Sequence, residues 1–482
     1  MLFPLIKIDM QRLTTPITAL FGWLLASLVS LASVQAQDIS GAWHGILDVQ
    51  GQKVPLVFHF ENVDGHWQGT MDSPAQGALG IPLTDVALAD SQLVVGIAAA
   101  GIRYEGRIVA ADSVAGTFHQ GGLQLPLALQ RNKEAAATPA VRRPQEPQPP
   151  FPYQTEEVTF AGGHDGVRLA GTRTLPDGEG PWPAAVVLAG SGPNDRDQHL
   201  FGHKTLLVIA DDLARRGIAT LRYDKRGVAA SEGAYATATA RDFADDARAA
   251  CDYLSQRAEI DPARVGLIGH SEGGMIAPLV AGDRPDVAFL ALLAAPGIPI
   301  DSLMVIQNHK LGQTAGMNDA QLAQALATNR EIYRLLREIA DSDSLHAELD
   351  RLLREQALAN GIPAEQIDPF VAAQVQQLAS PWHRYFINYD PEPALVALKA
   401  PVLAINGEND QQVTAKENLH GIASALRKGG NTQVTIKAFP TLNHLLQESE
   451  TGAVSESATI EQTVAPVVLE TLSHWIKQVT TR

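Results

Sequence analysis

The chain contains almost no cysteine. Of its 482 residues one is a cysteine, Cys251, and a single thiol cannot form an intramolecular disulfide, so packed hydrophobic cores must stabilise the fold. Cys251 lies within residues 249–254 of a predicted amphipathic helix, where a buried structural thiol is expected rather than a catalytic one. No group of cysteine and histidine residues has the spacing of a zinc site. The sequence therefore indicates neither a metal nor an organic cofactor.

Positive charge is also scarce. The 37 lysine and arginine residues are outnumbered by 53 aspartate and glutamate residues, which gives a formal net charge of −16. Binding to nucleic acid depends on a basic surface that neutralises phosphates, and no lysine- or arginine-rich cluster supplies one. The composition, with 45% hydrophobic and 19% charged residues, is that of a globular protein. The length of the chain predicts two or three folding units.

Long hydrophobic runs are absent except near the N-terminus. There, residues 20–31 form an apolar run that follows Lys7 and Arg12 and precedes small residues at positions 34–36. This pattern predicts a signal peptide over residues 1–36, which would be cleaved on export to the periplasm or out of the cell. A retained membrane anchor is the alternative, although the run is shorter than the roughly 20 residues of a membrane-spanning helix. No stable membrane anchor is therefore expected.

Residues 37–132 have the pattern of a small all-β domain. Short runs of β-branched and aromatic residues alternate with turn-forming residues, at the spacing of an antiparallel sandwich or barrel. Its aromatic side chains are expected in the core, because one face of such a sheet is buried. These aromatic residues are Trp43, Phe58, Phe60, Trp67 and Phe118. Nothing in the segment identifies a ligand or a partner. Residues 133–152 are rich in proline and predict an extended linker.

From residue 153 to residue 482, strand-like and helix-like segments alternate. The predicted strands span residues 184–189, 218–223, 264–268, 287–293, 400–405 and 432–436, and the predicted helices span residues 206–216, 241–257, 274–281 and 464–479. Repeated βα units predict an α/β fold with a doubly wound, mostly parallel sheet covered by helices on both faces. Residues 300–395 interrupt the alternation with helical patterns alone. Ligands bind beyond the carboxyl ends of the strands in such folds, so this insertion is expected to cap the site. A helical extension packed elsewhere is the alternative.

Residues 269–273 have the sequence Gly-His-Ser-Glu-Gly and lie between a predicted strand and a predicted helix. In this context the pattern is typical of a nucleophile elbow, a sharp turn that exposes the serine hydroxyl at the end of a strand. The turn also directs the N-terminus of the helix at the serine, which favours developing negative charge. Ser271 is therefore the predicted nucleophile. The neighbouring His270 is expected to point away from the cleft and pack in the interior.

A serine hydroxyl is a weak nucleophile that needs a base and an acidic residue to orient that base. In the elbow architecture both follow the serine in the order acid, then histidine. Asp410 and His444 each follow a predicted strand, so they are expected at the same edge of the sheet as Ser271. Asp410 could instead cap the helical turn that follows it, in which case Glu408 would be the acid.

The oxyanion that forms during acyl transfer needs two backbone N–H donors. The residue after the nucleophile, Glu272, is expected to supply one of them. The glycine-rich residues 190–195 follow an early strand, and their backbone can approach an oxyanion closely. The N–H of Ser191 is the predicted second donor, and the N–H of Gly192 is the alternative.

From about residue 153 onward the chain resembles bacterial α/β-hydrolases of the serine-aminopeptidase-like and dienelactone-hydrolase-like group, which are mostly esterases. The resemblance is carried by residues 190–197, 222–227 and 269–274, together with Asp410 and His444. It implies the α/β-hydrolase fold and a triad formed by Ser271 and these two residues. It says little about the substrate.

Together these features favour a serine hydrolase that acts on a small-molecule carboxylic ester through an acyl-enzyme intermediate. An aminopeptidase-type serine peptidase acting on short peptides is the alternative, and it would need an acidic group in the cap to bind the substrate ammonium. The available acidic residues are Glu331, Glu338, Asp341 and Asp343. A non-catalytic binding protein is a further alternative, against which a complete triad argues.

Overall fold

The computed structural model describes most of the chain. It covers residues 38–481 except residues 50–51, 64, 74–77, 98–100, 121–122, 132–140, 315, 360–361 and 363. The predicted signal peptide and the first part of the predicted linker lie outside the described residues. Of the helices in the described part, none combines the length and the hydrophobicity that crossing a membrane requires.

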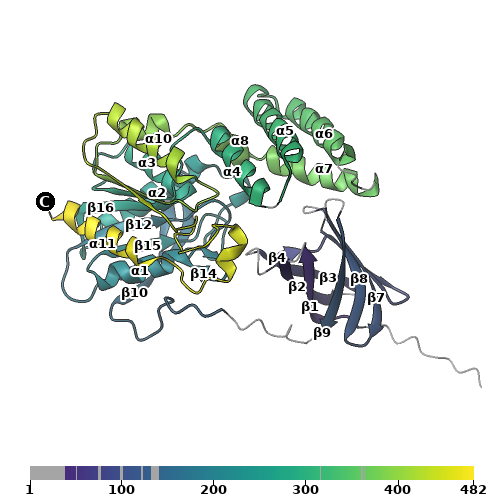
Figure 1. Ribbon diagram of the computed structural model, residues 1–482. Helices are drawn as coiled ribbons and strands as arrows, with labels where there is room; N and C mark the ends of the chain where they lie inside the picture. The colour runs from purple at the N-terminus through teal and green to yellow at the C-terminus, as the bar shows by residue number, and fades with distance from the viewer. Residues whose placement is uncertain are drawn as a thin grey trace, which may run out of the picture. The chain divides into compact units, whose positions relative to one another are not determined.

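An antiparallel sheet of nine strands forms the N-terminal domain. Its strands are β1 (Gly41–Val49), β2 (Gln52–Val63), β3 (His66–Ser73), β4 (Ala78–Pro82), β5 (Asp85–Ala89), β6 (Gln92–Ile97), β7 (Ile102–Ala110), β8 (Ser113–Gln120) and β9 (Leu123–Arg131). They lie in the order β4-β3-β2-β1-β9-β8-β7-β6-β5. Between the two edge strands, the Leu83 N–H donates to Gly69 in β3, and the Thr84 N–H donates to Gly96 in β6. The sheet therefore curls toward closure (Figure 1).

The core of this domain contains the predicted aromatic residues. Trp43, Phe58, Phe60 and Phe118 are buried, and Trp67 is half-buried against them. The sequence patterns missed three strands of the sheet. Two of these, β4 and β5, are only five residues long, and the third, β9, contains a proline.

The second sheet has eight strands and confirms the predicted doubly wound arrangement. Its strands are β10 (Gln154–Gly162), β11 (Val167–Leu175), β12 (Trp182–Leu188), β15 (Ala219–Tyr223), β16 (Ile260–His270), β17 (Leu290–Leu293), β18 (Val402–Gly407) and β19 (Val434–Phe439). They lie in the order β10-β11-β15-β12-β16-β17-β18-β19. The pairs β10–β11 and β11–β15 are antiparallel, and the other pairs are parallel. Strands β15 and β16 flank β12 on opposite sides, so the chain order reverses there, at the place where open α/β sheets bind ligands.

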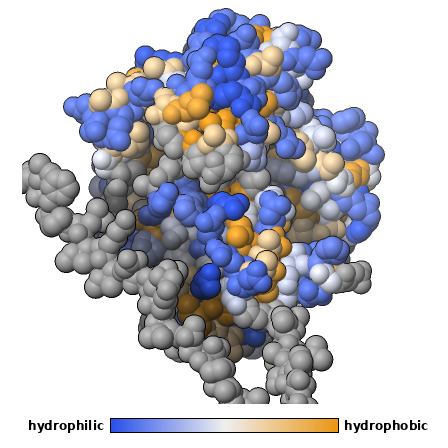
Figure 2. Space-filling view, turned by 90° about the vertical axis from the view of Figure 1, so that its right-hand side faces the viewer, coloured by the Kyte–Doolittle hydropathy of each residue, from blue (hydrophilic) through white to orange (hydrophobic). Residues whose placement is uncertain are grey.

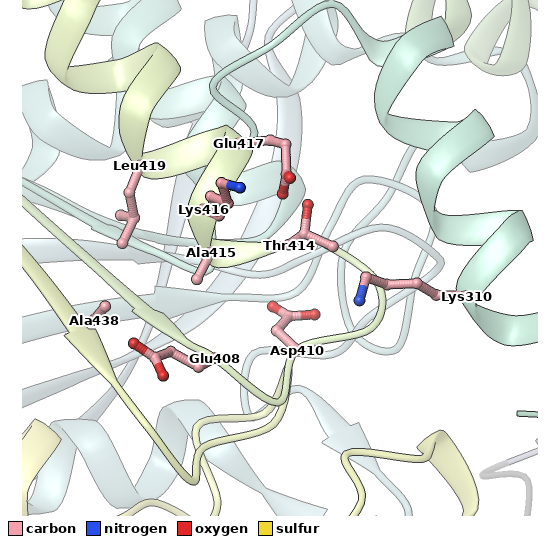
Figure 3. A pocket seen from close by; sticks show the side chains of 9 residues that line it. All are labelled: Lys310, Glu408, Asp410, Thr414, Ala415, Lys416, Glu417, Leu419 and Ala438. Carbon is pink, nitrogen blue, oxygen red and sulfur yellow. The ribbon is translucent and has the colours of Figure 1, made fainter.

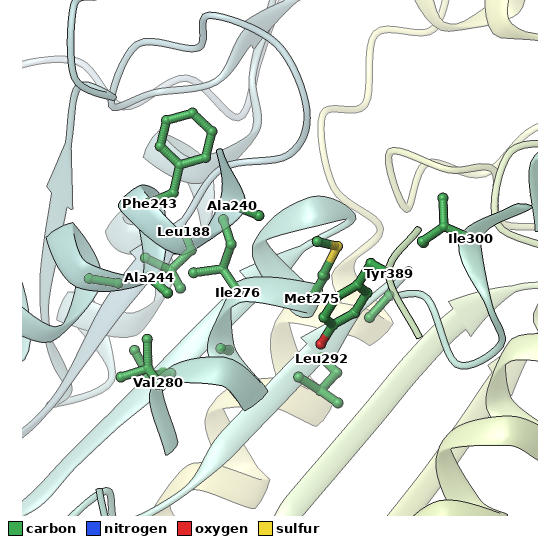
Figure 4. Packing of buried hydrophobic residues seen from close by; sticks show 14 of the residues in the cluster. Leu188, Ala240, Phe243, Ala244, Met275, Ile276, Val280, Leu292, Ile300 and Tyr389 are labelled. Carbon is green, nitrogen blue, oxygen red and sulfur yellow. The ribbon is translucent and has the colours of Figure 1, made fainter. Parts of the chain in front are cut away.

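Helices cover both faces of this sheet (Figure 1). Helices α1 (Thr205–Arg215) and α11 (Pro466–Thr480) cover one face, and α2 (Ala240–Ser255), α3 (Glu272–Ala281) and α10 (Ala415–Lys428) cover the other. Successive residues of a strand point to opposite faces, so Val187 of β12 packs with the first group and Val186 with the second. In the core between the sheet and the second group of helices, Phe243 of α2 and Ile276 of α3 lie near Leu188 of β12 (Figure 4).

Helices alone occupy the insertion between β17 and β18. They are α4 (Ile300–Thr314), α5 (Asp319–Glu338), α6 (Ser342–Ala359), α7 (Ala364–Leu378), α8 (Pro381–Ile387) and α9 (Glu392–Ala397). Their apolar rows are buried, for example at Leu322, Leu336 and Leu352. Figure 2 looks onto the side of the molecule that carries these helices, and the surface there is mostly hydrophilic. Exposed ion pairs such as those of Arg334 with Glu331 and Glu338 contribute to that surface.

The last part of the predicted linker is bound to the α/β domain that follows it. The Arg143 guanidinium donates to four backbone carbonyls, those of Phe201, Gly202, Ala458 and Ile460. Such bonds to a charged donor are stronger than bonds between neutral groups. These hydrogen bonds hold the chain before β10 against the segments that follow β12 and β19.

A buried ion pair anchors the segment after β15 to helix α2. Arg226 donates from Nε and Nη2 to the two carboxylate oxygens of Asp246, both at 2.8 Å. The side chains are only 6% and 1% exposed. A bidentate pair of this kind holds its partners in one geometry, so it fixes the residues next to Arg226 in the chain.

We predict that Asp246→Ala destabilises the α/β domain strongly. The substitution leaves the Arg226 guanidinium buried without its main partner, which costs about 3–5 kcal/mol. Urea denaturation followed by tryptophan fluorescence would measure the loss. Glu348→Ala, which breaks an exposed pair with Arg351 on α6, is the matched control and should cost less than about 1 kcal/mol. Equal effects of the two substitutions would contradict the anchoring role.

Candidate active site

Ser271 occupies the sharp turn between β16 and α3. Its φ of 53° and ψ of −117° lie in a region that L-residues seldom adopt. The flanking glycines are required by close backbone contacts. A Cβ on Gly269 would lie 2.1 Å from the Gly273 carbonyl oxygen, and a Cβ on Gly273 would lie 2.3 Å from the Leu188 carbonyl oxygen. The local sequence thus folds as the elbow pattern predicts.

The structure brings Ser271, His444 and Asp410 together in one hydrogen-bonded chain. His444 Nε2 lies 3.1 Å from Ser271 Oγ, and His444 Nδ1 lies 2.8 Å from Asp410 Oδ2. A carboxylate only accepts, so Nδ1 carries the proton and Nε2 is free to accept from the serine hydroxyl. His444 and Asp410 are buried, and Ser271 is half-buried. This is the geometry in which a histidine can activate a serine.

Asp410, rather than Glu408, is the acid that contacts His444. While Oδ2 of Asp410 accepts from His444, its Oδ1 accepts from the backbone N–H groups of Gln412 and Val413, both at 2.8 Å. Asp410 therefore caps the following turn and orients the histidine with the same carboxylate. Glu408 is exposed and lines, with Asp410 and Lys310 of α4, a cavity of about 540 Å³ (Figure 3).

The loop that carries His444 is held by its neighbour Asn443. The Asn443 side-chain oxygen accepts from the N–H groups of Leu445 and Gln447, and its amide donates to the Gln447 side chain and to Ser457. All of these contacts are buried. The histidine backbone is therefore fixed by groups that take no part in the triad.

The predicted oxyanion loop lies beside the nucleophile. A Cβ on Gly190 would lie 3.2 Å from the Ser271 Cβ, a tight contact that shows how closely the backbone of this loop approaches Ser271. Among the hydrogen bonds of the described residues, none occupies the N–H of Ser191 or that of Glu272. The two predicted donors are thus free to bind an oxyanion.

His270 connects the triad histidine to the oxyanion loop. Its Nε2 lies 2.8 Å from the His444 carbonyl oxygen, and its Nδ1 lies 3.0 Å from Gln198 Nε2. The Gln198 side-chain oxygen in turn accepts from the Gly190 N–H at 2.8 Å. Burial lowers the pKa of His270 to about 3, and the electrostatic interaction with His444 acts in the same direction. A neutral His270 donates from Nε2 and accepts at Nδ1, which matches both partners.

The Glu272 side chain makes a second connection on the other side of Ser271. Its Oε2 accepts from Lys225 Nζ at 2.9 Å, and its Oε1 accepts from the Trp382 indole N–H of α8 at 2.6 Å. Lys225 also donates to the Gly190 carbonyl at 2.6 Å. An indole from the helical insertion therefore reaches the residue next to the nucleophile.

Sequence reasoning missed the roles of Gln198, Lys225 and Trp382. Lys225 lies in the segment that carries the family resemblance, directly after a predicted strand. Its place at the end of a strand could have marked it as a candidate site residue. Gln198 and Trp382 lie at no such place in the sequence. The contact of Gln198 with His270 spans 72 residues of chain, and the contact of Trp382 with Glu272 spans 110.

We predict that His270 makes folding stability depend on pH. The unfolded-state pKa of histidine is about 6.5, whereas the folded-state pKa is about 3. Between these values the unfolded chain binds the extra proton, so the free energy of unfolding rises with pH there. His270→Gln should make this slope shallower by up to about 1.4 kcal/mol per pH unit.

Chemical denaturation at several pH values between about 4.5 and 6.5 would measure the slope, because this range lies between the two pKa values of His270 given above. His346→Gln, at an exposed position on α6, is the control. Equal slopes for wild type and His270→Gln would show that His270 does not stay neutral in the folded chain.

Comparison with protein families matches residues 204–451 to the family described as serine aminopeptidase, S33. Esterase EstD of Thermotoga maritima is 29% identical over 329 residues, which cover 68% of this chain and 68% of that protein. The putative esterase NocK of Nocardia uniformis subsp. tsuyamanensis is 35% identical over 159 residues, which cover 31% and 42%. Among solved structures, an esterase from Pyrococcus furiosus aligns over 68% of this chain and 90% of its own, with 13% identity and a TM-score of 0.41.

The family match spans slightly more than half of the chain and includes the hydrogen-bonded serine, histidine and aspartate. The sheet order and strand directions are those of the fold that the resemblance implied. This chain is a hydrolase of the α/β-hydrolase fold and belongs to the serine aminopeptidase, S33, family.

Proposed function

We propose that the chain hydrolyses carboxylic esters with Ser271 as the nucleophile, through an acyl-enzyme intermediate. The observation that carries the proposal is the chain of hydrogen bonds from Ser271 through His444 to Asp410. The relatives named as esterases support an ester as the substrate. The reaction needs no group beyond these residues and water.

In the first half of the reaction, Ser271 Oγ attacks the ester carbonyl carbon while its proton passes to His444 Nε2. The carbonyl oxygen becomes an oxyanion, which the N–H groups of Ser191 and Glu272 bind. The tetrahedral intermediate then expels the alcohol, which takes the proton from His444 as the carbon–oxygen bond breaks. Asp410 stabilises the transient imidazolium by accepting from His444 Nδ1. The acyl group remains on Ser271.

In the second half, a water molecule attacks the acyl carbon and gives its proton to His444 Nε2. The second tetrahedral intermediate uses the same two N–H donors. Its collapse breaks the bond to Ser271 Oγ, which recovers a proton from His444, and the carboxylic acid leaves. The enzyme returns to its starting protonation state.

A serine aminopeptidase is the second candidate, because the matched family carries that description. It requires a free carboxylate near the site to bind the substrate ammonium. Three of the four acidic residues considered for that role are engaged within the insertion. Glu331 and Glu338 pair with Arg334, and Asp341 accepts from the Ser344 N–H. Their engagement argues against these three residues as the group that binds the substrate ammonium.

We also propose that the protein acts outside the cytoplasm, in the periplasm or as a secreted protein. The ground is the charged, apolar and small-residue pattern of residues 1–36. The near absence of cysteine is compatible with that location, since the fold needs no disulfide.

We predict that Ser271→Ala abolishes both ester turnover and covalent labelling by a fluorophosphonate. Loss of the nucleophile should lower kcat by about 10⁴-fold or more. Purified protein would be assayed on short p-nitrophenyl esters and, in parallel, on aminoacyl p-nitroanilides. Faster turnover of the anilides than of the esters would favour the aminopeptidase.

The matched control is Ser342→Ala. Ser342 Oγ also lies near a histidine, His346 Nδ1, at 3.4 Å, but on an exposed helix without an orienting acid. This variant should be labelled like wild type. A folded wild type that is neither labelled nor active would contradict the proposed function and favour a binding protein.

A further inference from the structure

The carbonyl of Gly190 is held by two side chains. Lys225 Nζ donates to it at 2.6 Å, and Asn194 Nδ2 donates to it at 2.9 Å. The Gly190 N–H is held as well, because it donates to Gln198 Oε1. Both backbone groups of Gly190 are therefore bonded to side chains that are themselves buried, which restricts the rotation of its two peptide groups.

These bonds determine where the next N–H points. The Gly190–Ser191 peptide is not among the cis bonds of the described residues, and in a trans peptide the C=O and the following N–H point in opposite directions. Since the Gly190 carbonyl faces Lys225, the Ser191 N–H faces away from it. The contact of Gly190 with Ser271 places this peptide beside the nucleophile.

Lys225 acts on the peptide that carries the Ser191 N–H, because it holds the carbonyl of that same peptide, the Gly190 carbonyl. The alternative donor, the Gly192 N–H, belongs to the next peptide, whose carbonyl, that of Ser191, accepts from Asn194 Nδ2 at 2.7 Å. A role of Lys225 in the reaction therefore concerns the Ser191 donor.

We propose that Lys225 is a positioning residue of the hydrolysis, whose ammonium holds the Gly190 carbonyl so that the N–H of Ser191 faces the substrate oxyanion. The inference rests on the proposed function, because it assigns a role in the reaction that Ser271 begins. It adds a residue that touches neither the substrate nor the triad.

The surroundings of Lys225 suit this role. The side chains of Lys225 and Glu272 are 6% and 0% exposed, and a buried ammonium is tolerated only with a charged or strongly accepting partner. Its Nζ also lies 4.7 Å from the centre of the Phe243 ring. Glu272 thus balances the charge while Gly190 receives a charge-assisted bond. That bond polarises the peptide and makes its N–H a better donor.

The test compares Lys225→Met with the double variant Lys225→Met/Glu272→Gln. The single variant leaves the Glu272 carboxylate buried without its cation and is expected to lose stability. The double variant removes that charge, while the glutamine can still accept from the Trp382 indole. Lys399→Met is the matched control, because Lys399 Nζ also donates to a glycine carbonyl, that of Gly429 at 2.7 Å, on the exposed surface.

Four quantities are measured on folded protein of each variant. They are kcat and KM for a p-nitrophenyl ester, the inhibition constant of an alkyl boronic acid that forms a tetrahedral adduct with the serine, and the rate of fluorophosphonate labelling. A misaligned oxyanion donor lowers kcat by about 10- to 100-fold and leaves KM within about twofold, because the oxyanion exists only after the attack. The boronic acid should bind more weakly by a similar factor. The double variant should share these losses while recovering thermal stability, and Lys399→Met should match wild type.

Stability loss without a loss in kcat or boronic acid affinity in the double variant would show that Lys225 is a structural residue only, and would overturn the inference alone. Failure of wild type to react with the ester and with the fluorophosphonate would overturn the proposed function and the inference together. A wild type that is labelled but turns over no ester still tests Lys225, since phosphonylation develops charge on the same oxygen site.

Discussion

Close backbone contact around Ser271 is the constraint on which the site depends. Three segments of the chain meet there, and glycine occupies each point of contact. A Cβ would lie 2.1 Å from a neighbouring oxygen at Gly269, 2.3 Å at Gly273, and 3.2 Å from the serine Cβ at Gly190. A Cβ at Gly269 or Gly273 would collide with backbone atoms, and a Cβ at Gly190 would press on the Ser271 side chain, so larger residues would disturb the place where Ser271 meets the loop after β12. The strained backbone of Ser271 persists because these contacts over-determine it.

The residues on either side of Ser271 extend this constraint to the rest of the site. His270 binds the backbone of His444 and, through Gln198, the N–H of Gly190. Glu272 binds Lys225, which binds the carbonyl of Gly190. Ser271, the loop of His444 and the loop of Gly190 are therefore joined by one buried hydrogen-bond network. Such networks are rigid when every member is satisfied, so these three parts of the site hold fixed positions relative to one another.

The helical insertion joins this network through Trp382, whose indole contacts Glu272. On the other side of the triad, Lys310 of α4 lines the cavity beside Asp410. Two helices of the insertion therefore approach the reacting groups from different directions. The insertion therefore contributes side chains to the surroundings of Glu272 and Asp410.

Much of the catalytic domain and the core of the site could be predicted from the sequence, because both depend on local patterns. Alternating βα segments implied a mostly parallel sheet, and the ends of parallel strands meet at one edge, so the order of Ser271, Asp410 and His444 along the chain was enough to group them. Strands β10 and β11 escaped prediction, since their charged residues, such as Arg173 paired with Glu156, conceal the apolar alternation of a strand.

Only the tertiary structure decided the remaining features, because they depend on how distant segments pack. Asp410 and Glu408 lie two residues apart, and the turn directs the carboxylate of Asp410 to His444 while Glu408 is exposed. Lys225 and Trp382 reach Glu272 across 47 and 110 residues of chain. No local pattern encodes such contacts, since each follows from the folded positions of two separate elements. The sequence was therefore enough to predict the serine, histidine and aspartate of the site, whereas the groups that hold them in place could be identified only from the folded chain.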